Sequence, residues 1–240
     1  MWSLSKKEFR QFFSSLTGYI AITSFLLLSG LFLFIFPDTN LFELGYASLD
    51  GFFERSPWIL LLLIPAITMR SFSDEFKAGT FEILRTRPLS SLQLVLGKYF
   101  GALSVVLLAL LPTLIYVFVL YSLAGETGID GGQIAGSYVG LFFLSAVFTA
   151  IGIATSSFTS NSVVAFLMSA LACFVLYSGF NAISRIPVLS AGADYYAEML
   201  GIDFHYRSMS RGVIDLRDLV YFISLAGAFL FISRKKITAS

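Results

Sequence analysis

The sequence predicts an all-α membrane protein with six transmembrane helices, and three observations lead to that fold class. Hydrophobic residues make up 57% of the 240 residues, charged residues only 13%, and the mean hydropathy is +0.82. Soluble domains carry about 25% charged residues. The apolar runs approach the roughly 20 residues that a helix needs to cross a hydrocarbon core about 30 Å thick. We therefore expect a single membrane domain over residues 1–240.

Six apolar runs separated by polar breaks are the predicted spans. They cover residues 16–36, 57–72, 91–121, 133–156, 162–180 and 218–233. The second run is short for a bilayer and contains Pro65, so Arg70 would have to snorkel and the bilayer to thin locally.

The third run is longer than a bilayer requires, so it is expected to begin outside the hydrocarbon. Ser90 or Ser91 would cap its first turn, and Lys98 would reach back to the headgroups. Pro112 is expected to kink the helix, because proline lacks the backbone N–H that an α-helix uses.

The distribution of Lys and Arg predicts the orientation. If the amino terminus is inside, eleven of the 16 basic residues lie on the cytosolic side and five outside, which is the positive-inside pattern. Both termini are then cytosolic. The acidic residues concentrate outside, so the net charge of +1 conceals this asymmetry and does not indicate nucleic-acid binding.

Residues 1–15 precede the first span and have their own periodicity. Trp2, Phe9 and Phe12 fall on one helical face, and Lys6 and Arg10 on the other. Such a helix should lie in the inner headgroup plane. The alternative is a first span that starts early with a basic flank.

Residues 73–90 interrupt the apolar sequence with charges on the predicted cytosolic side. Phe72, Phe76 and Ile83 form an apolar stripe, while Glu75 and Glu82 fall on another face with Gly79 between them. Two carboxylates around a bare backbone patch suit the basic or backbone groups of a partner. The alternative is a solvated loop whose charges only enforce topology.

Two further polar segments separate spans. Residues 157–161 form a tight, uncharged turn on the same side as the charged segment, so both could contact one partner. Residues 181–217 lie outside and are expected to form a small lid or helix pair rather than a folded domain. The single histidine, His205, is expected there as a surface residue, because one histidine does not make a metal site.

Small residues occur four apart in the fourth span, as Gly136 with Gly140 and Ala150 with Ala154. This spacing permits close helix contact, either within the chain or in a dimer. The only cysteine, Cys173, has no disulfide partner and is expected to be a small buried hydrophobe.

No catalytic or cofactor motif is present. The chain lacks a G-x-x-x-x-G-K-[ST] loop, a G-x-S-x-G elbow and an H-E-x-x-H pair, so we expect neither an enzyme nor a bound cofactor or metal. Apart from Lys98, the third to fifth spans contain no ionisable residue, which disfavours an ion-driven carrier. Energy for movement would have to come from a partner.

Three segments resemble the ABC-2 type permeases, the membrane subunits of one class of ABC transporters. The run KKEFRQFFSSLTGYI (6–20) resembles their elbow helix, although Leu16 and Thr17 stand where a proline is common. The run DEFKAGTFEILRTRPLSSLQLVLGK (74–98) is similar to their glutamate, Gly-Thr, proline and Gly-Lys pattern. The run RGVIDLRDLVYFIS (211–224) is similar to the entry into their last span. Within the family, residues 57–72 and the closing run most resemble GldF, the gliding-motility-associated permease subunit.

The resemblance implies an architecture and a set of partners. It implies an amino-terminal interfacial elbow helix, a cytosolic coupling segment and an extracytoplasmic helical hairpin before the last span, in the bacterial inner membrane. The implied partners are a separate cytosolic ATPase, which would carry ATP and Mg, and a second permease subunit that can bear a large extracytoplasmic domain. The implied ATPase-coupling residues are Glu75, Gly79, Thr80, Glu82, Arg85, Ser157, Thr159 and Asn161.

Two functions from different classes therefore remain open. The first is a permease subunit in which an ATPase moves the coupling segment and so rearranges the helix bundle. The second is a membrane anchor or assembly scaffold that links an ATPase to extracytoplasmic machinery without moving a solute. A membrane-embedded enzyme would need a catalytic constellation that the sequence lacks.

Overall fold

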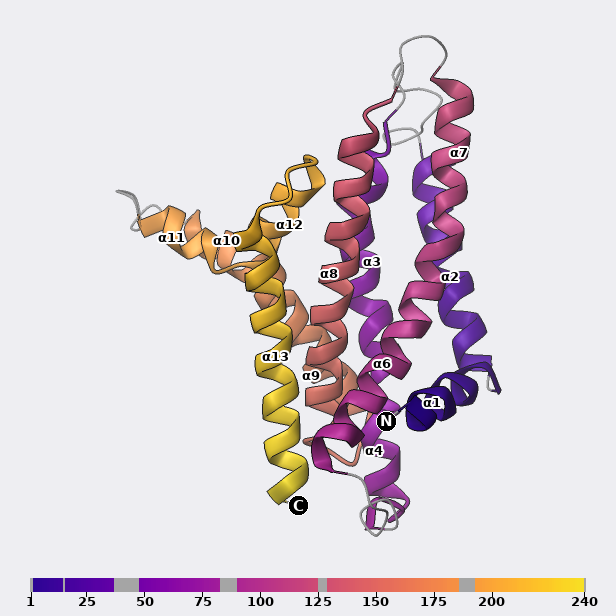
Figure 1. The fold of residues 1–240 in the computed structure, drawn as a ribbon, viewed down its shortest axis with the longest axis vertical. Coiled ribbons are helices and arrows are strands. Elements are labelled where there is room, and N and C mark those ends of the chain that lie inside the picture. The colour runs from indigo at the N-terminus through magenta and orange to yellow at the C-terminus, as the bar shows by residue number, and fades with distance from the viewer. Residues whose placement is uncertain are drawn as a thin grey trace.

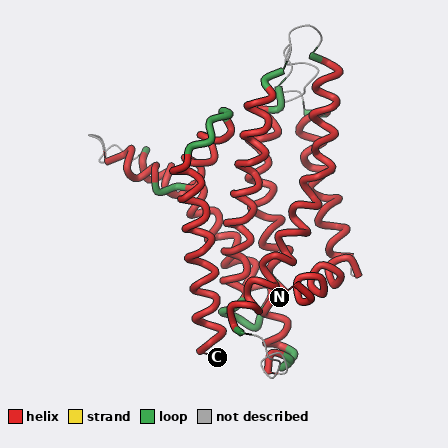
Figure 2. The backbone as a smooth tube through the Cα atoms, in the orientation of Figure 1, coloured by secondary structure: helices red, strands yellow, loops and turns green. Residues whose placement is uncertain are grey.

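Figure 1 shows the computed structural model, a bundle of long helices. The structure describes residues 2–14, 16–36, 48–82, 90–124, 129–185 and 193–239, and no strand occurs among them. Both chain termini lie toward one end of the bundle, which we call the lower end. Figure 2 shows the loops gathered mainly at the ends of the long helices. The prediction of an all-α protein is confirmed for the described residues.

Helix α1 (Trp2–Ser14) lies across the lower end and α2 (Leu16–Phe34) rises from it. The axes of Leu4–Ser14 and Gly18–Phe34 differ by 73°. Helix α1 packs on α6 (Ser91–Leu110), where Ser5 donates a hydrogen bond of 3.0 Å to the Gly97 carbonyl. A Cβ atom on Gly97 would lie 2.6 Å from the Leu4 side chain, so this glycine permits the close crossing.

Helix α3 (Asp50–Thr68) descends and continues almost directly into α4 (Arg70–Lys77). Together they form a candidate span of 28 residues. The second predicted span lies within this segment, but the helix is longer than predicted, since it begins at Asp50 and not at Pro57. The charged residues before Pro57 belong to the helix and not to a preceding loop.

Helix α6 begins with a capping box. The Ser90 hydroxyl accepts a hydrogen bond from the Gln93 amide, and the Gln93 side chain accepts one from the Ser90 amide, which satisfies two amides of the first turn. The predicted break at Pro112 is confirmed, since a 3₁₀ turn, η2 (Leu111–Thr113), separates α6 from α7 (Leu114–Leu123).

Helix α8 (Gly131–Ser156) is the central helix, and most of its side chains are buried. Its small residues pack within the chain. A Cβ atom on Gly136 would lie 2.7 Å from the Met209 carbonyl oxygen, and one on Gly140 would lie 3.3 Å from the Tyr206 ring. Both contacts are with α12 (Ile202–Ser210). This glycine pair therefore permits close packing of α8 on α12 within one chain.

Helix α9 (Ser162–Phe174) continues through a π-helical turn, η4 (Val175–Gly179), into α10 (Phe180–Ser184), a candidate span of 23 residues. Helix α11 (Ala193–Met199) and α12 then form a helix pair beside the bundle, and α13 (Leu216–Ala239) returns to the lower end. Cys173 in α9 is fully buried, as expected.

His205 in α12 is not the surface residue that we predicted. It is 3% exposed, its Nδ1 lies 2.6 Å from Asp218 Oδ1, and its Nε2 lies 2.9 Å from the Met199 carbonyl oxygen. Its ring stacks on Tyr221 with centroids 3.9 Å apart. The histidine therefore joins α12 to α13.

Five helical segments of the described chain are long and apolar enough to cross a membrane. The bent pair of α1 and α2 makes a sixth if it is counted as one broken span. The chain is thus a multi-pass membrane protein, while the six-span topology with both termini cytosolic stays a prediction.

Candidate functional site

A buried lysine holds three elements together near the lower end of the bundle. Lys98 in α6 is 2% exposed. Its Nζ lies 3.0 Å from Glu8 Oε1 in α1 and 2.8 Å from Glu75 Oε1 in α4. It also donates a hydrogen bond of 2.6 Å to the Ser71 carbonyl. All three ammonium protons can therefore be donated to acceptors from other elements.

The aromatic ring of Phe72 covers the same ammonium, with Nζ 5.0 Å from the ring centroid. Phe72 is fully buried, and so is Glu75 Oε2, which has no hydrogen-bond partner among the described residues. One lysine and two carboxylates thus share a site that water hardly reaches. Removing one member of such a cluster leaves an uncompensated buried charge.

Lys98 does not reach the headgroups as we predicted. The side chain points into the bundle because Glu8 and Glu75 supply the negative charge there. The third helix therefore begins with a buried ionic contact, and α1 and α4 are joined through it.

The turn after α4 has the geometry of a Schellman motif. The Thr80 amide donates to the Glu75 carbonyl at 3.1 Å and the Gly79 amide to the Phe76 carbonyl at 3.3 Å, which satisfies carbonyls left open at the helix end. Gly79 has φ +67°, a conformation that glycine adopts without steric cost. The helical periodicity that we used to place Glu82 on one face with Glu75 therefore ends at Lys77.

The two predicted polar segments meet around one hollow at the lower end. This hollow has a volume of about 380 Å³. It is lined by Phe76, Gly79, Phe81, Glu82, Ser157, Phe158, Thr159, Ser160 and Lys236. Phe76 and Phe81 pack edge to face with centroids 4.7 Å apart, and Phe158 is half exposed. We call this set of residues the lower-end hollow.

The predicted coupling residues fall into three groups. Glu75 is turned inward to Lys98, and Ser157 is buried with its hydroxyl bonded to the Ala154 carbonyl at 2.6 Å. Asn161 is exposed but caps α9 by accepting from the Val163 amide at 3.0 Å. Gly79, Glu82 and Thr159 line the lower-end hollow, and Thr80 is exposed beside it. Arg85 lies outside the described residues.

Sequence reasoning missed two contributors to this region. Glu8 was assigned no role from the sequence, because its pairing with Lys98 across 90 residues leaves no local signal. Lys236 was counted only for orientation, yet its ammonium lies 6.0 Å from the Phe158 ring centroid. The sequence does not show that the end of the last helix lies beside residues 157–161. Without that placement, Lys236 could not be predicted to belong to this site.

Gly79 offers a direct test of the turn. Replacing it by Ala is expected to destabilise the turn by about 1–2 kcal/mol, because a side chain disfavours the left-handed conformation. Nothing lies within 4 Å of the new Cβ atom, so the cost is purely conformational. Hydrogen exchange of the Thr80 amide should then accelerate. Asn, which tolerates this conformation, should behave closer to the natural glycine. Equal exchange for Ala and Gly would contradict this account.

These features define the class of the protein. It is a multi-pass helical membrane protein with a surface hollow at one end. A buried ion cluster joins α4, the helix beside this hollow, to α6 and α1. In the described part of the chain, no group of three or more His, Cys, Asp or Glu could hold a metal ion.

The chain belongs to the ABC-2 family of transporter proteins, whose family model matches residues 2–198. It is therefore a permease-type membrane subunit of an ABC transporter, a family that works with a cytosolic ABC ATPase. The match includes α1, α4 and the turn at residues 157–161, and ends before α12 and α13. A comparison with curated proteins found no match.

Proposed function

We propose that this subunit converts ATP hydrolysis by a separate cytosolic ATPase into movement of the helix bundle, with the lower-end hollow as the ATPase contact. The observation that carries the proposal is the direct continuation of α3 into α4. Helices α3 and α4 together form one helical segment of 28 residues. Displacement of the turn after α4 would therefore move α3, which lies inside the bundle.

The chemistry of the hollow suits a protein contact. Phe76, Phe81 and Phe158 supply apolar surface, and Glu82 and Lys236 supply charges of both signs. Interface cores are enriched in aromatic residues and depleted of charge, which is kept at the rim. The excess of basic residues on this side in the sequence supports a cytosolic position for the hollow, where an ATPase would meet it.

The ion cluster gives Glu75 a role that differs from direct contact. With Lys98 between Glu75 and Glu8, movement of α4 is transmitted to α1 as well as to α3. Glu75 is then a positioning residue for the coupling segment. The contact residues would be the exposed Gly79, Thr80 and Glu82 and the partly exposed Thr159.

The finer assignment is a gliding-motility-associated complex. The likeness of residues 57–72 and the closing run to GldF supports it, and implies a second permease subunit as the dimer partner. The complex would lie in the bacterial inner membrane. Co-purification of this chain from its native membrane, followed by identification of its ATPase and permease partners, would test this assignment.

A scaffold function is the second candidate, favoured by a cavity at the opposite end. This cavity has a volume of about 1110 Å³ and contains both acidic and basic side chains, among them Glu54, Arg185 and Arg211. Such a surface suits docking of extracytoplasmic machinery. A scaffold would retain its ATPase without changing the rate of ATP hydrolysis.

Reversing the charge of Glu82 tests the coupling proposal. In a reconstituted complex with the co-purified ATPase, Glu82→Lys is expected to weaken the contact about tenfold, equivalent to about 1.4 kcal/mol, and to lower ATPase stimulation accordingly. Glu54→Lys is the matched control, since Glu54 is also exposed but lies at the opposite end. Full stimulation with Glu82→Lys would exclude this face as the ATPase contact, and stimulation absent even in the natural chain would favour the scaffold.

A further inference from the structure

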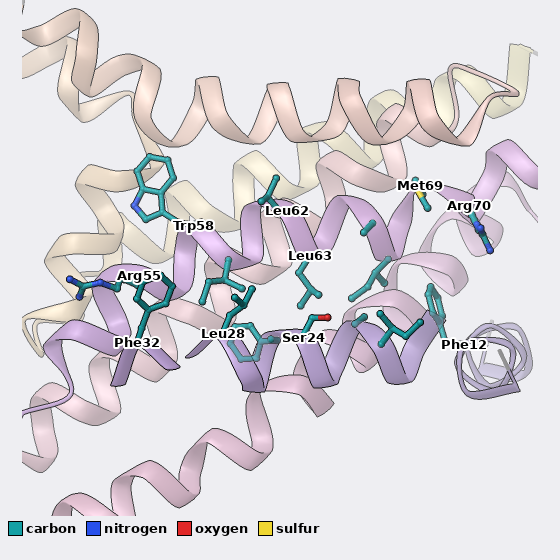
Figure 3. Close-up of a pocket in the computed structure, with 16 residues that line it drawn as sticks. Phe12, Ser24, Leu28, Phe32, Arg55, Trp58, Leu62, Leu63, Met69 and Arg70 are labelled. Carbon is teal, nitrogen blue, oxygen red and sulfur yellow. The ribbon is translucent and has the colours of Figure 1, made fainter. Parts of the chain in front are cut away.

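A long apolar groove runs between α2 and α3 and shares no lining residue with the lower-end hollow. Its volume is about 640 Å³. Figure 3 shows side chains of both helices converging on it, with Phe32, Arg55 and Trp58 toward one end and Phe12, Met69 and Arg70 toward the other. Between these ends the lining is aliphatic apart from Phe25 and from Ser24, which contributes a hydroxyl.

The sequence explains the shape of this groove. On α3 the lining residues Ile59, Leu62 and Ala66 follow the i, i+3, i+7 spacing of one helical face. The groove stays open because Ala21 and Ser24 on α2 and Ala66 on α3 have small side chains. Larger side chains at these positions would fill it. The 15 residue-to-residue steps from Arg55 to Arg70 cover about 22 Å at about 1.5 Å per step. The groove thus runs along most of a hydrocarbon core about 30 Å thick.

The two arginines at its ends are not equivalent. Arg55 is engaged by the protein, since it donates to the Gly51 carbonyl at 3.1 Å and lies 5.8 Å from the Phe32 ring centroid. Arg70 is exposed and forms no ion pair or hydrogen bond with any described residue. Asp74, one turn further along, is also exposed, and the two side chains do not form an ion pair. Arg70 is therefore available to an anion at the lower end of the groove.

Helix α1 adds positive charge at the same end. Its Phe12 lines the groove beside Arg70 (Figure 3). The helix also exposes Lys6, Lys7 and Arg10. An anionic group at the Arg70 guanidinium would thus lie at the same end of the groove as a helix with three exposed basic side chains.

We propose that this groove binds an anionic phospholipid, with one acyl chain lying along the aliphatic lining and the phosphate at Arg70. The apolar groove matches an acyl chain of such a lipid, and the Arg70 guanidinium at its mouth matches the phosphate. A second copy of this chain fits less well, because a two-fold contact in a membrane would bring the same face, with the same arginine at the same depth, against itself. Like charges placed opposite each other oppose such a contact.

Lipid retention by the full chain provides the test. The protein purified in detergent would be given phosphatidylglycerol or phosphatidylcholine with identical acyl chains, and bound lipid counted by native mass spectrometry. The natural chain should retain phosphatidylglycerol preferentially. Arg70→Gln should lower that retention about fivefold, the effect of one basic residue at an anionic surface, and leave phosphatidylcholine unchanged. Ala66→Trp should block the groove and lower retention of both lipids.

Arg185→Gln is the matched control, since it removes an exposed arginine from the other end of the molecule. An equal loss with this variant would show unspecific attraction and overturn the proposal, as would equal retention of both lipids by the natural chain. Leu62→Cys adds a thiol to the groove, while the natural Cys173 is buried. A disulfide between two copies through this thiol would identify a second chain as the occupant. Arg70 is exposed, so its replacement should fold even if Ala66→Trp does not.

Discussion

Lys98→Met is expected to destabilise the protein by about 3–5 kcal/mol, the cost of leaving buried charges without their partner. The two carboxylates that the ammonium joins, Glu8 and Glu75, would then face each other in a site that is nearly closed to water. Methionine has a similar length, so the loss comes from charge and hydrogen bonding and not from a cavity. Reversible unfolding in mixed micelles, monitored by circular dichroism, would measure it.

Lys77→Met is the control for this prediction. Lys77 ends α4 but is exposed and makes no ion pair with any described residue, so its loss should change stability by less than about 0.5 kcal/mol. The triple variant Lys98→Met, Glu8→Gln, Glu75→Gln should recover much of the stability, because neutral side chains need no counter-charge. Equal stability of the Lys98 and Lys77 variants would show that the cluster does not hold α1 and α4 together.

The helices were predictable from the sequence because a bilayer leaves the backbone few alternatives. Backbone groups in hydrocarbon must be paired internally, so a long apolar run indicates a helix. Local signals then marked the cap at Ser90 and the break at Pro112 correctly. The start of α3 was missed since Asp50, Glu54 and Arg55 are polar, and hydropathy does not distinguish a helix that extends beyond the hydrocarbon from a loop.

The candidate site was predictable only in outline. Its two segments were found because charges and polar turns interrupt apolar runs, and the structure places them around one hollow. The inward direction of Glu75 was not predictable, because it depends on Lys98, which is 23 residues away. The burial of His205 depends in the same way on Asp218 and Tyr221 of another helix. Pairings of single side chains between helices leave no periodic pattern in one sequence.

Gly152→Ala is expected to destabilise the bundle by about 1–3 kcal/mol, the usual cost of overpacking a well-filled core. Gly152 in α8 faces Thr68 at the end of α3, and a Cβ atom there would overlap the Thr68 hydroxyl oxygen and lie 2.7 Å from its Cβ. The threonine cannot turn away freely, since its hydroxyl donates to the Ile64 carbonyl at 2.8 Å. The backbones of α3 and α8 must therefore separate.

Gly227→Ala gives the opposite expectation in the same measurement. Gly227 also lies within a helix, α13, but nothing lies within 4 Å of an added Cβ atom. The change should therefore stabilise the protein by about 0.5–1 kcal/mol through helix propensity. Thr68→Ala, added to Gly152→Ala, should recover part of the loss by removing the hydroxyl. If both glycine variants shifted stability in the same direction, close packing of α3 on α8 would not explain the effect of Gly152→Ala.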